Sequence, residues 1–205
     1  MPKLNYMRLF GVVCAVMLTA VTYLCYVSNE TEDIRSSVLR LHVVANSDSE
    51  ADQALKLMVR DEIIERCGFL FRDCRTLEES ERTAQNNLGF FTYVAREVIK
   101  EQGSDYPVVC QVERCRFPTK SYERANKSAL SLPKGEYSAL NIRIGEAAGA
   151  NWWCVMYPPL CFVNGVVDSG DEKLRDTLTE SEYRLITDDS PQVQIKFKIA
   201  EWLGR

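Results

Sequence analysis

The feature that most constrains this sequence of 205 residues is a stretch without any charged residue from Leu9 to Val27. About 20 apolar residues are enough to cross a bilayer as a helix. Basic residues precede the stretch and acidic residues follow it. This order favours a cytoplasmic N-terminus and an exported remainder. Residues 1–29 are therefore predicted to be a signal peptide or an uncleaved membrane anchor.

Two fates of this segment stay open. A cleavable signal peptide ends in small residues at an A-x-A-like site. Residues 22–28 (TYLCYVS) are mostly bulky, and Cys25 lacks the small preceding residue of a lipoprotein site. The pattern favours an uncleaved anchor over a cleaved signal. We expect residues 30–37 to form a short polar linker and residues 38–205 to form one extracytoplasmic domain.

The exported part is acidic. The formal net charge of the chain is −4, and it becomes −6 without Lys3 and Arg8, since no acid precedes Ser28. Without a basic block, nucleic acid is not an expected partner. The same charge argues against electrostatic docking on an anionic lipid surface. The expected membrane contact is the N-terminal segment.

The secondary-structure pattern is a strand, two helices and then several strands. Thr76 and Glu79 have capping-box spacing, and Gly89 is expected to weaken or bend the helix that follows. Such an order predicts an α+β fold with two helices packed on a mainly antiparallel sheet. Strands are expected at 38–45, 108–117, 136–144 and 152–157, and helices at 50–66 and 77–101. The strands 136–144 and 152–157 are expected to form a hairpin. Residues 164–191 are expected to be mostly loop with a short helix, and residues 193–203 a strand or a terminal helix.

Cysteine usage agrees with export. Six of the eight cysteines lie outside the apolar stretch, and an even number in an exported chain suggests disulfides. If the chain reverses at Tyr157 and Pro158, Cys154 and Cys161 lie opposite each other within disulfide reach. Closing so short a loop contributes about 2–3 kcal/mol, although two reduced thiols stay an alternative. No firm pairing follows for Cys67, Cys74, Cys110 and Cys115.

No catalytic or metal-binding pattern stands out. The single histidine, His42, has no catalytic neighbours in the sequence, and no C-x-x-C, P-loop or H-E-x-x-H motif occurs. Cys110 and Cys115 are five positions apart in a predicted strand, so they face opposite sides and share no metal. Asp168-Ser169-Gly170 matches the aspartic protease tripeptide, but that chemistry needs a second carboxylate and the tripeptide is ordinary turn sequence. We expect no enzyme, metal or cofactor, with a hydrolase that uses Asp168 as an alternative.

The segment 151–162 (NWWCVMYPPLCF) is rich in rigid apolar residues. In a strand, Trp152 and Trp153 point to opposite faces. One can fill the core, while the other, with Tyr157 and the prolines, can form a surface that loses little entropy on binding a protein. Burial of both faces under helices stays an alternative.

Four segments resemble the stage II sporulation protein R family. They are residues 41–63, 116–122 (RFPTKSY), 132–137 (LPKGEY) and 149–162 (GANWWCVMYPPLCF). The Asn-Ser-Asp turn at 46–48 and the Trp-Trp-Cys segment are its specific signals. The resemblance covers about residues 38–163, whereas the N-terminal segment is similar only in kind. The first four exported cysteines are not part of it, which weakens any full disulfide framework.

The resemblance implies a signalling role in endospore formation. Such a protein is exported from the forespore into the intermembrane space, where it activates a membrane-embedded aspartic protease of the mother cell. That protease processes the sigma-E precursor. The motifs suggest contacts with the protease, although a role as a cap or a core residue stays open for several of them. The candidates are Asn46, Asp48, Lys120, Glu136, Trp152, Trp153 and Pro158. An envelope-anchored structural or binding module is the alternative.

Overall fold

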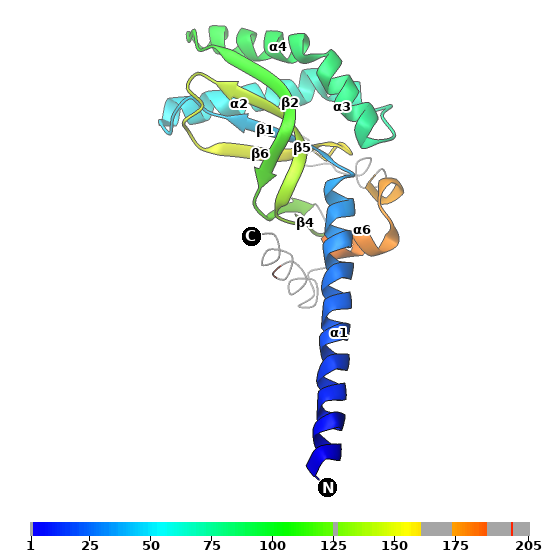
Figure 1. Cartoon of the computed structure of the whole chain (residues 1–205). Helices are drawn as coiled ribbons and strands as arrows, with labels where there is room; N and C mark the ends of the chain where they lie inside the picture. The colour runs from blue at the N-terminus through cyan, green and yellow to red at the C-terminus, as the bar shows by residue number, and fades with distance from the viewer. Residues whose placement is uncertain (1, 125–126, 161–173, 188–197, 199–205) are drawn as a thin grey trace.

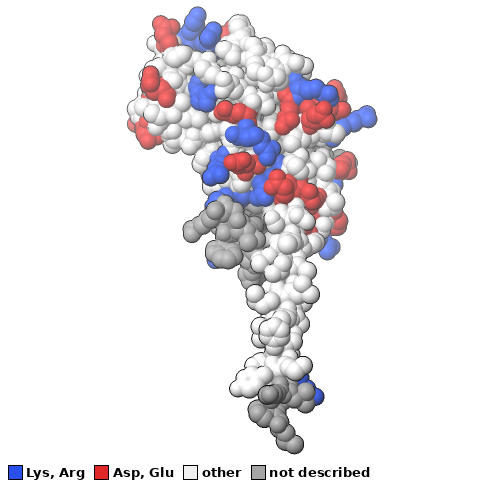
Figure 2. Space-filling view, viewed as in Figure 1, with Lys and Arg blue, Asp and Glu red and all other residues white. Residues whose placement is uncertain are grey.

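A long N-terminal helix projects from a folded domain (Figure 1). The computed structural model describes residues 2–124, 127–160, 174–187 and 198. Helix α1 (Pro2–Arg35) contains the apolar stretch, and within the described residues it is the one helix long and apolar enough to cross a membrane. Figure 2 shows the middle of this helix as a surface without charged side chains.

The end of α1 packs on the domain. The sequence predicts a linker at residues 30–37, but the helix continues through Arg35. Glu30, Thr31 and Ile34 are buried, and α1 contacts helix α6 (Glu180–Thr187) and strand β5 (Gly135–Ile144). The segment between the apolar stretch and the sheet is therefore mostly helical and held against the domain.

The domain has an α+β fold, as predicted, built on a sheet of four strands in the order β2-β5-β1-β6. Strand β1 pairs with β5 in parallel and with β6 antiparallel, and β2 pairs with β5 antiparallel. The remaining bounds are β1 (Leu39–Val44), β2 (Val108–Phe117) and β6 (Asn151–Tyr157). The sheet is thus mixed but mainly antiparallel.

The predicted hairpin of 136–144 and 152–157 is wrong. Strand β1 lies between β5 and β6, so these two strands are not neighbours. Their connection crosses the end of β1, where Gly149 N donates to Ala45 O at 3.1 Å and Ala148 N donates to Asn46 O at 3.1 Å. The short loop fits because β1 fills the gap between the two strands and supplies hydrogen-bond partners for the loop.

Helices α2 (Glu50–Cys67), α3 (Leu77–Asn86) and α4 (Leu88–Glu101) cover one face of the sheet (Figure 1). A side-chain cap opens each of the first two, because Asp52 N donates to Ser49 Oγ and Glu79 N donates to Thr76 Oγ1. The second bond confirms the capping box predicted at Thr76 and Glu79. A short 3-10 turn, η1 (Gly68–Phe71), follows α2. The main core lies between these helices and the sheet.

The prediction of one helix over 77–101 is wrong in one respect. The helix is interrupted at Asn87 and not at Gly89. The Asn87 side chain donates to the Thr83 carbonyl at 2.7 Å. Such a local side-chain bond offers a carbonyl of the last turn a partner in place of a continuing backbone N–H.

The opposite face of the sheet is only partly covered. Its cover is a hairpin of β3 (Lys120–Arg124) and β4 (Lys127–Leu132), helix α6 and the end of α1, which enclose a second core. Sequence reasoning missed this hairpin, whereas α6 confirms the short helix expected within 164–191. Residues 193–203 are expected to form a strand or a terminal helix. Apart from Lys198 they lie outside the described ranges, so this stays a prediction.

Candidate partner-binding face

The second sheet face also carries a row of polar and aromatic side chains that ranges from the exposed Gln111 to the buried Asn141. Gln111, Asn141, His42 and Trp153 lie directly opposite one another across the four strands. We call this row, with Arg40 and Lys120 beside it, the partner face. Residues of one face alternate along a strand, and the apolar neighbours of the row point to the helices instead. The row therefore occupies a sheet surface that the main core does not use.

Several buried polar atoms on this face lack partners. They are Arg40 Nη1, His42 Nδ1, Asn141 Oδ1 and Trp153 Nε1, none of which has a hydrogen bond within the structure as described. Buried polar atoms in native proteins are nearly all paired, so each exception needs a reason. Four such atoms lie on neighbouring residues of one sheet face. This surface therefore has more buried polar atoms without hydrogen bonds than any other described part of the fold.

Arg40 is the most unusual of these residues. Its side chain is fully buried, and its guanidinium lies 4.1 Å from the ring centroid of Phe117 and 4.9 Å from that of Tyr137. It donates to the Tyr122 hydroxyl and, at 3.4 Å, to the Cys154 carbonyl. No carboxylate among the described residues pairs with it. Burial lowers the pKa of Arg40 while the two tyrosines oppose that shift, and an arginine stays charged because its ordinary pKa is so high.

Lys120 and Trp153 are two predicted contacts that the fold brings together. The Lys120 Nζ lies 5.0 Å from the Trp153 ring centroid, a cation–π distance. Phe117 and His42 flank the same indole at 6.4 and 6.2 Å between ring centroids. Within the described ranges Lys120 also has no carboxylate partner. The face thus holds two cations that are matched by aromatic rings and not by acids.

His42 is held as a neutral hydrogen-bonded residue, in line with the sequence-based expectation. Its Nε2 lies 2.8 Å from Asn151 Oδ1. Burial is the main cause that lowers the pKa of His42, against the opposing bond to Asn151 and the nearby Glu113. An imidazole with a lowered pKa is uncharged at neutral pH.

Several side chains on β2 and β5 of this face bond to one another. Asn141 Nδ2 donates to Glu113 Oε1 at 2.5 Å, and Arg143 lies 3.4 Å from the same carboxylate and donates to Gln111 at 2.5 Å. Sequence reasoning missed Arg40, Asn141 and Glu113. Polar residues alternate with apolar ones along β1 and β5, and this alternation shows which residues of each strand share a face. It does not show which residues of different strands are neighbours, so the row was not predicted.

Asn46 and Asp48 lie elsewhere, in the turn before α2. Asn46 accepts from Glu146 N at 3.0 Å and donates to Asp52 at 2.8 Å, and Asp48 accepts from Ala150 N at 2.6 Å. Their polar atoms hold the loop between β5 and β6. A contact of these two residues with a partner stays a prediction.

The other candidates are also dispersed. Trp152 faces the helices, with its ring centroid 4.9 Å from the Arg60 guanidinium. Pro158 is buried, and Glu136 pairs with Arg116 at 3.1 Å near the end of α1. Cys161 and Asp168 lie outside the described residues, so the Cys154–Cys161 disulfide stays a prediction and the hydrolase alternative is not tested. Within the described residues, no group of three or more His, Cys, Asp or Glu side chains is placed to hold a metal ion.

The fold and this face define a class: an α+β domain carried on one apolar helix, with a polar and aromatic sheet surface. The comparisons with known proteins give the family. Residues 35–167 match the stage II sporulation protein R family. Stage II sporulation protein R of Bacillus subtilis (strain 168) is 30% identical over 193 residues, which cover 86% of this chain and 84% of that protein. The chain belongs to the stage II sporulation protein R family. No solved structure matches it.

Proposed function

We propose that this protein is the intercompartmental signal of endospore formation in its organism. In this proposal it is exported from the forespore and binds a membrane-embedded aspartic protease of the mother cell, which then processes the sigma-E precursor. It acts as a ligand and carries out no chemistry of its own. Membership of a family named for a sporulation stage supports this role, and α1 is compatible with export.

The observation that carries the binding part is the charge pattern of the partner face. Lys120 is a half-buried cation with an aromatic neighbour and no carboxylate partner among the described residues, and the fully buried Arg40 bonds to Tyr122 of the same strand. Trp153 adds a half-buried aromatic ring beside Lys120. An acidic segment of the protease, with an apolar residue beside the acid, would complement these groups. Complementary charge favours the correct partner and speeds encounter.

Activation requires that the ligand distinguish two states of the protease. A ligand shifts an equilibrium only by its difference in affinity for the two states. In this proposal the active state presents its acidic segment to the partner face, and the inactive state does not. The aromatic residues of the face are rigid, so little side-chain entropy is lost when the complex forms.

The test is an immunoblot for the sigma-E precursor in sporulating cells that lack the gene and carry a variant copy. Wild type should restore cleavage, whereas Trp153→Ala and Lys120→Glu should reduce it strongly. Tyr93→Ala and Arg82→Glu are matched controls, because both side chains are exposed on helices of the opposite layer. Normal processing in the deletion would overturn the signalling role. Normal processing in both face variants would overturn only the assignment of the surface.

A further inference from the structure

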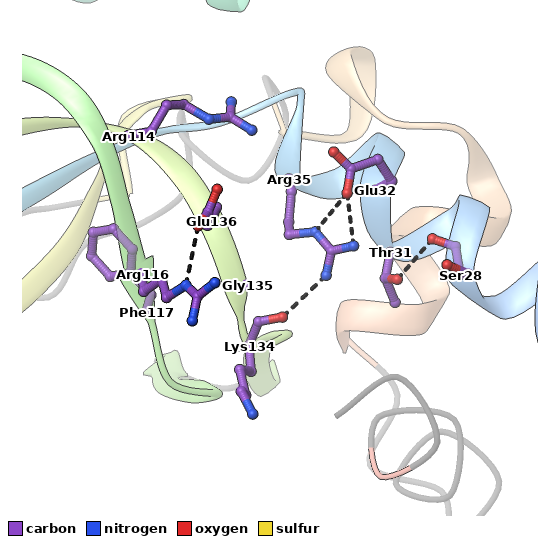
Figure 3. A pocket seen from close by; sticks show the side chains of 10 residues that line it. All are labelled: Ser28, Thr31, Glu32, Arg35, Arg114, Arg116, Phe117, Lys134, Gly135 and Glu136. Carbon is purple, nitrogen blue, oxygen red and sulfur yellow. Dashed lines mark hydrogen bonds and ion pairs between the residues drawn. The ribbon is translucent and has the colours of Figure 1, made fainter. Parts of the chain in front are cut away.

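A polar cavity lies where α1 joins the sheet. It has a volume of about 320 Å³ and is enclosed by the last two turns of α1 and by the adjoining ends of β2 and β5. Figure 3 shows the side chains that these elements contribute to its lining. None of the residues that line the cavity belongs to the partner face, although Phe117 also contacts Arg40 and Trp153 of that face. It is therefore a separate candidate site.

Positive charge predominates in this cavity. Arg35, Arg114, Arg116 and Lys134 line it, against Glu32 and Glu136. Both carboxylates are already paired, Glu32 with Arg35 at 2.8 Å and Glu136 with Arg116 at 3.1 Å. Lys134 and Arg114 have no ion-pair partner within the described part of the chain. The lining carries four cations and two acids, so an anion is the ligand that its charge favours.

The position of the cavity along α1 indicates which anion is present there. Its lining residues on the helix begin at Ser28, directly after the apolar stretch, and end at Arg35. At about 1.5 Å per helical residue they lie about 2–12 Å beyond that stretch. The headgroup layer of a bilayer is about 5–7 Å thick on each side. If α1 enters the membrane, the end of the cavity near Ser28 lies at the depth of the lipid headgroups.

The helix is also fixed to the sheet at this point. Arg35 donates to the Lys134 carbonyl at 3.1 Å and lies against Gly135, where a Cβ would approach its Cδ to 2.3 Å. Ile34 of the same turn is fully buried in the second core. The cavity is thus held at a set height relative to the apolar stretch.

We propose that this cavity binds the phosphodiester of an anionic glycerophospholipid in the membrane that α1 enters. Arg116 and Lys134 contact the phosphate oxygens, since guanidinium and ammonium groups form strong charge-assisted bonds to phosphate. The bound headgroup seats the domain against the bilayer in one orientation. The acidic net charge of the domain does not oppose this, because α1 and not long-range attraction brings the cavity to the lipid.

The test uses the full chain in nanodiscs of phosphatidylcholine alone or mixed with phosphatidylglycerol. Hydrogen exchange should slow at residues 114–117 and 134–136 only when phosphatidylglycerol is present. Native mass spectrometry should retain phosphatidylglycerol on the wild type, and retention should fall roughly tenfold in Arg116→Gln/Lys134→Gln, which loses two charge-assisted contacts. Arg82→Gln/Lys100→Gln removes two exposed cations from the helical layer and should behave as the wild type.

Three outcomes would overturn the proposal. The first is equal exchange in both kinds of nanodisc, and the second is equal lipid retention by the double variant and the wild type. The third is the same protection from inorganic phosphate added to phosphatidylcholine nanodiscs, which would assign the cavity to a free anion. None of these readouts depends on signalling, so the result stands apart from the proposed function.

Discussion

Arg35, the last residue of α1, lies across the bare Cα of Gly135, the first residue of β5. A Cβ at position 135 would stand 2.3 Å from Arg35 Cδ, well inside the 3.5–4.0 Å at which carbon atoms make favourable contact. Arg35 also bonds to the Lys134 carbonyl and to Glu32. The absence of a side chain at position 135 therefore lets Arg35 lie flat on the sheet and reach the Lys134 carbonyl.

Gly135→Ala should destabilise the domain by about 0.5–1.5 kcal/mol, the usual net worth of one hydrogen bond, because the flexible Arg35 side chain can move away from the new methyl. The new methyl displaces Arg35 and breaks its bond to Lys134. Urea unfolding of the full chain in a non-ionic detergent measures the change. Gly89→Ala is the control, because a Cβ there meets nothing within 4 Å in helix α4. It should leave stability unchanged or raise it by up to about 1 kcal/mol. Equal effects of the two substitutions would contradict the packing argument.

Asn46→Ala should open the loop between β5 and β6. The substitution removes the acceptor for Glu146 N and a donor to Asp52, and we expect a loss of about 1–3 kcal/mol because partners are left unpaired. The same unfolding assay measures it, together with faster hydrogen exchange at residues 146–150. Asn86→Ala, at an exposed position of α3, should stay within about 0.5 kcal/mol. Unchanged exchange in the loop would show that backbone bonds alone hold it.

Protonation of Asp52 should make the domain less stable in acid. Hydrogen bonds from Ser47 and then Asn46 lower the pKa of Asp52 below its ordinary value. A lowered pKa in the folded state means that the carboxylate contributes stability above the unfolded pKa of about 3.9, and that this contribution is lost as the pH falls through the folded pKa. Thermal unfolding between pH 6 and pH 3 should therefore show a smaller change in Asp52→Asn than in the wild type. An identical pH dependence in both proteins would show that Asp52 does not contribute to the loss of stability in acid.

Local sequence patterns predicted most elements of this fold but not how they pair. Ser49, Thr76 and the alternating strands act through neighbours a few positions away, so the pattern shows them. The place of β1 between β5 and β6 depends on contacts about 100 residues apart, such as the bond of Glu146 N to Asn46. Nothing near either residue encodes that contact.

The candidate site was predicted in part for a related reason. Trp153 and Lys120 stand out as an aromatic and a basic residue within short motifs, and the fold places them in contact. Arg40 reads as an ordinary outward-facing strand residue. Its burial arises because Phe117, Tyr122 and Tyr137 come from three other strands. Only the tertiary structure brings these rings together.

Cys67 should be unreactive in the folded protein. Burial is the main cause that raises the pKa of this thiol to about 12. The thiolate is the reactive form, so N-ethylmaleimide at pH 8 should modify Cys67 only after unfolding in urea, as peptide mass spectrometry can show. The raised pKa also predicts that stability falls as pH rises above about 8.5, where the unfolded thiol ionises and the folded one does not. Equal labelling rates in native and unfolded protein would contradict the buried position.

Arg40→Met separates the stability of the partner face from its function. A buried cation without a carboxylate partner costs desolvation free energy, and replacing such groups by apolar residues of similar volume is often neutral or stabilising. We expect an unfolding midpoint at or above that of the wild type, because Met also fills the space between Phe117 and Tyr137. We expect weaker processing of the sigma-E precursor, because Tyr122 and with it strand β3, which carries Lys120, lose their bond to the guanidinium.

The two readouts together decide why the fold keeps Arg40. A stable variant that signals poorly means that the guanidinium serves recognition by holding Tyr122 and the β3–β4 hairpin in place. Arg40→Lys keeps the charge but loses the planar contact with the rings, so partial rescue would assign the effect to charge. A variant that unfolds readily would mean that the aromatic contacts outweigh desolvation, and Arg40 would then be a core residue. A variant that is stable and signals normally would remove Arg40 from the partner face and leave Lys120 and Trp153 as its centre.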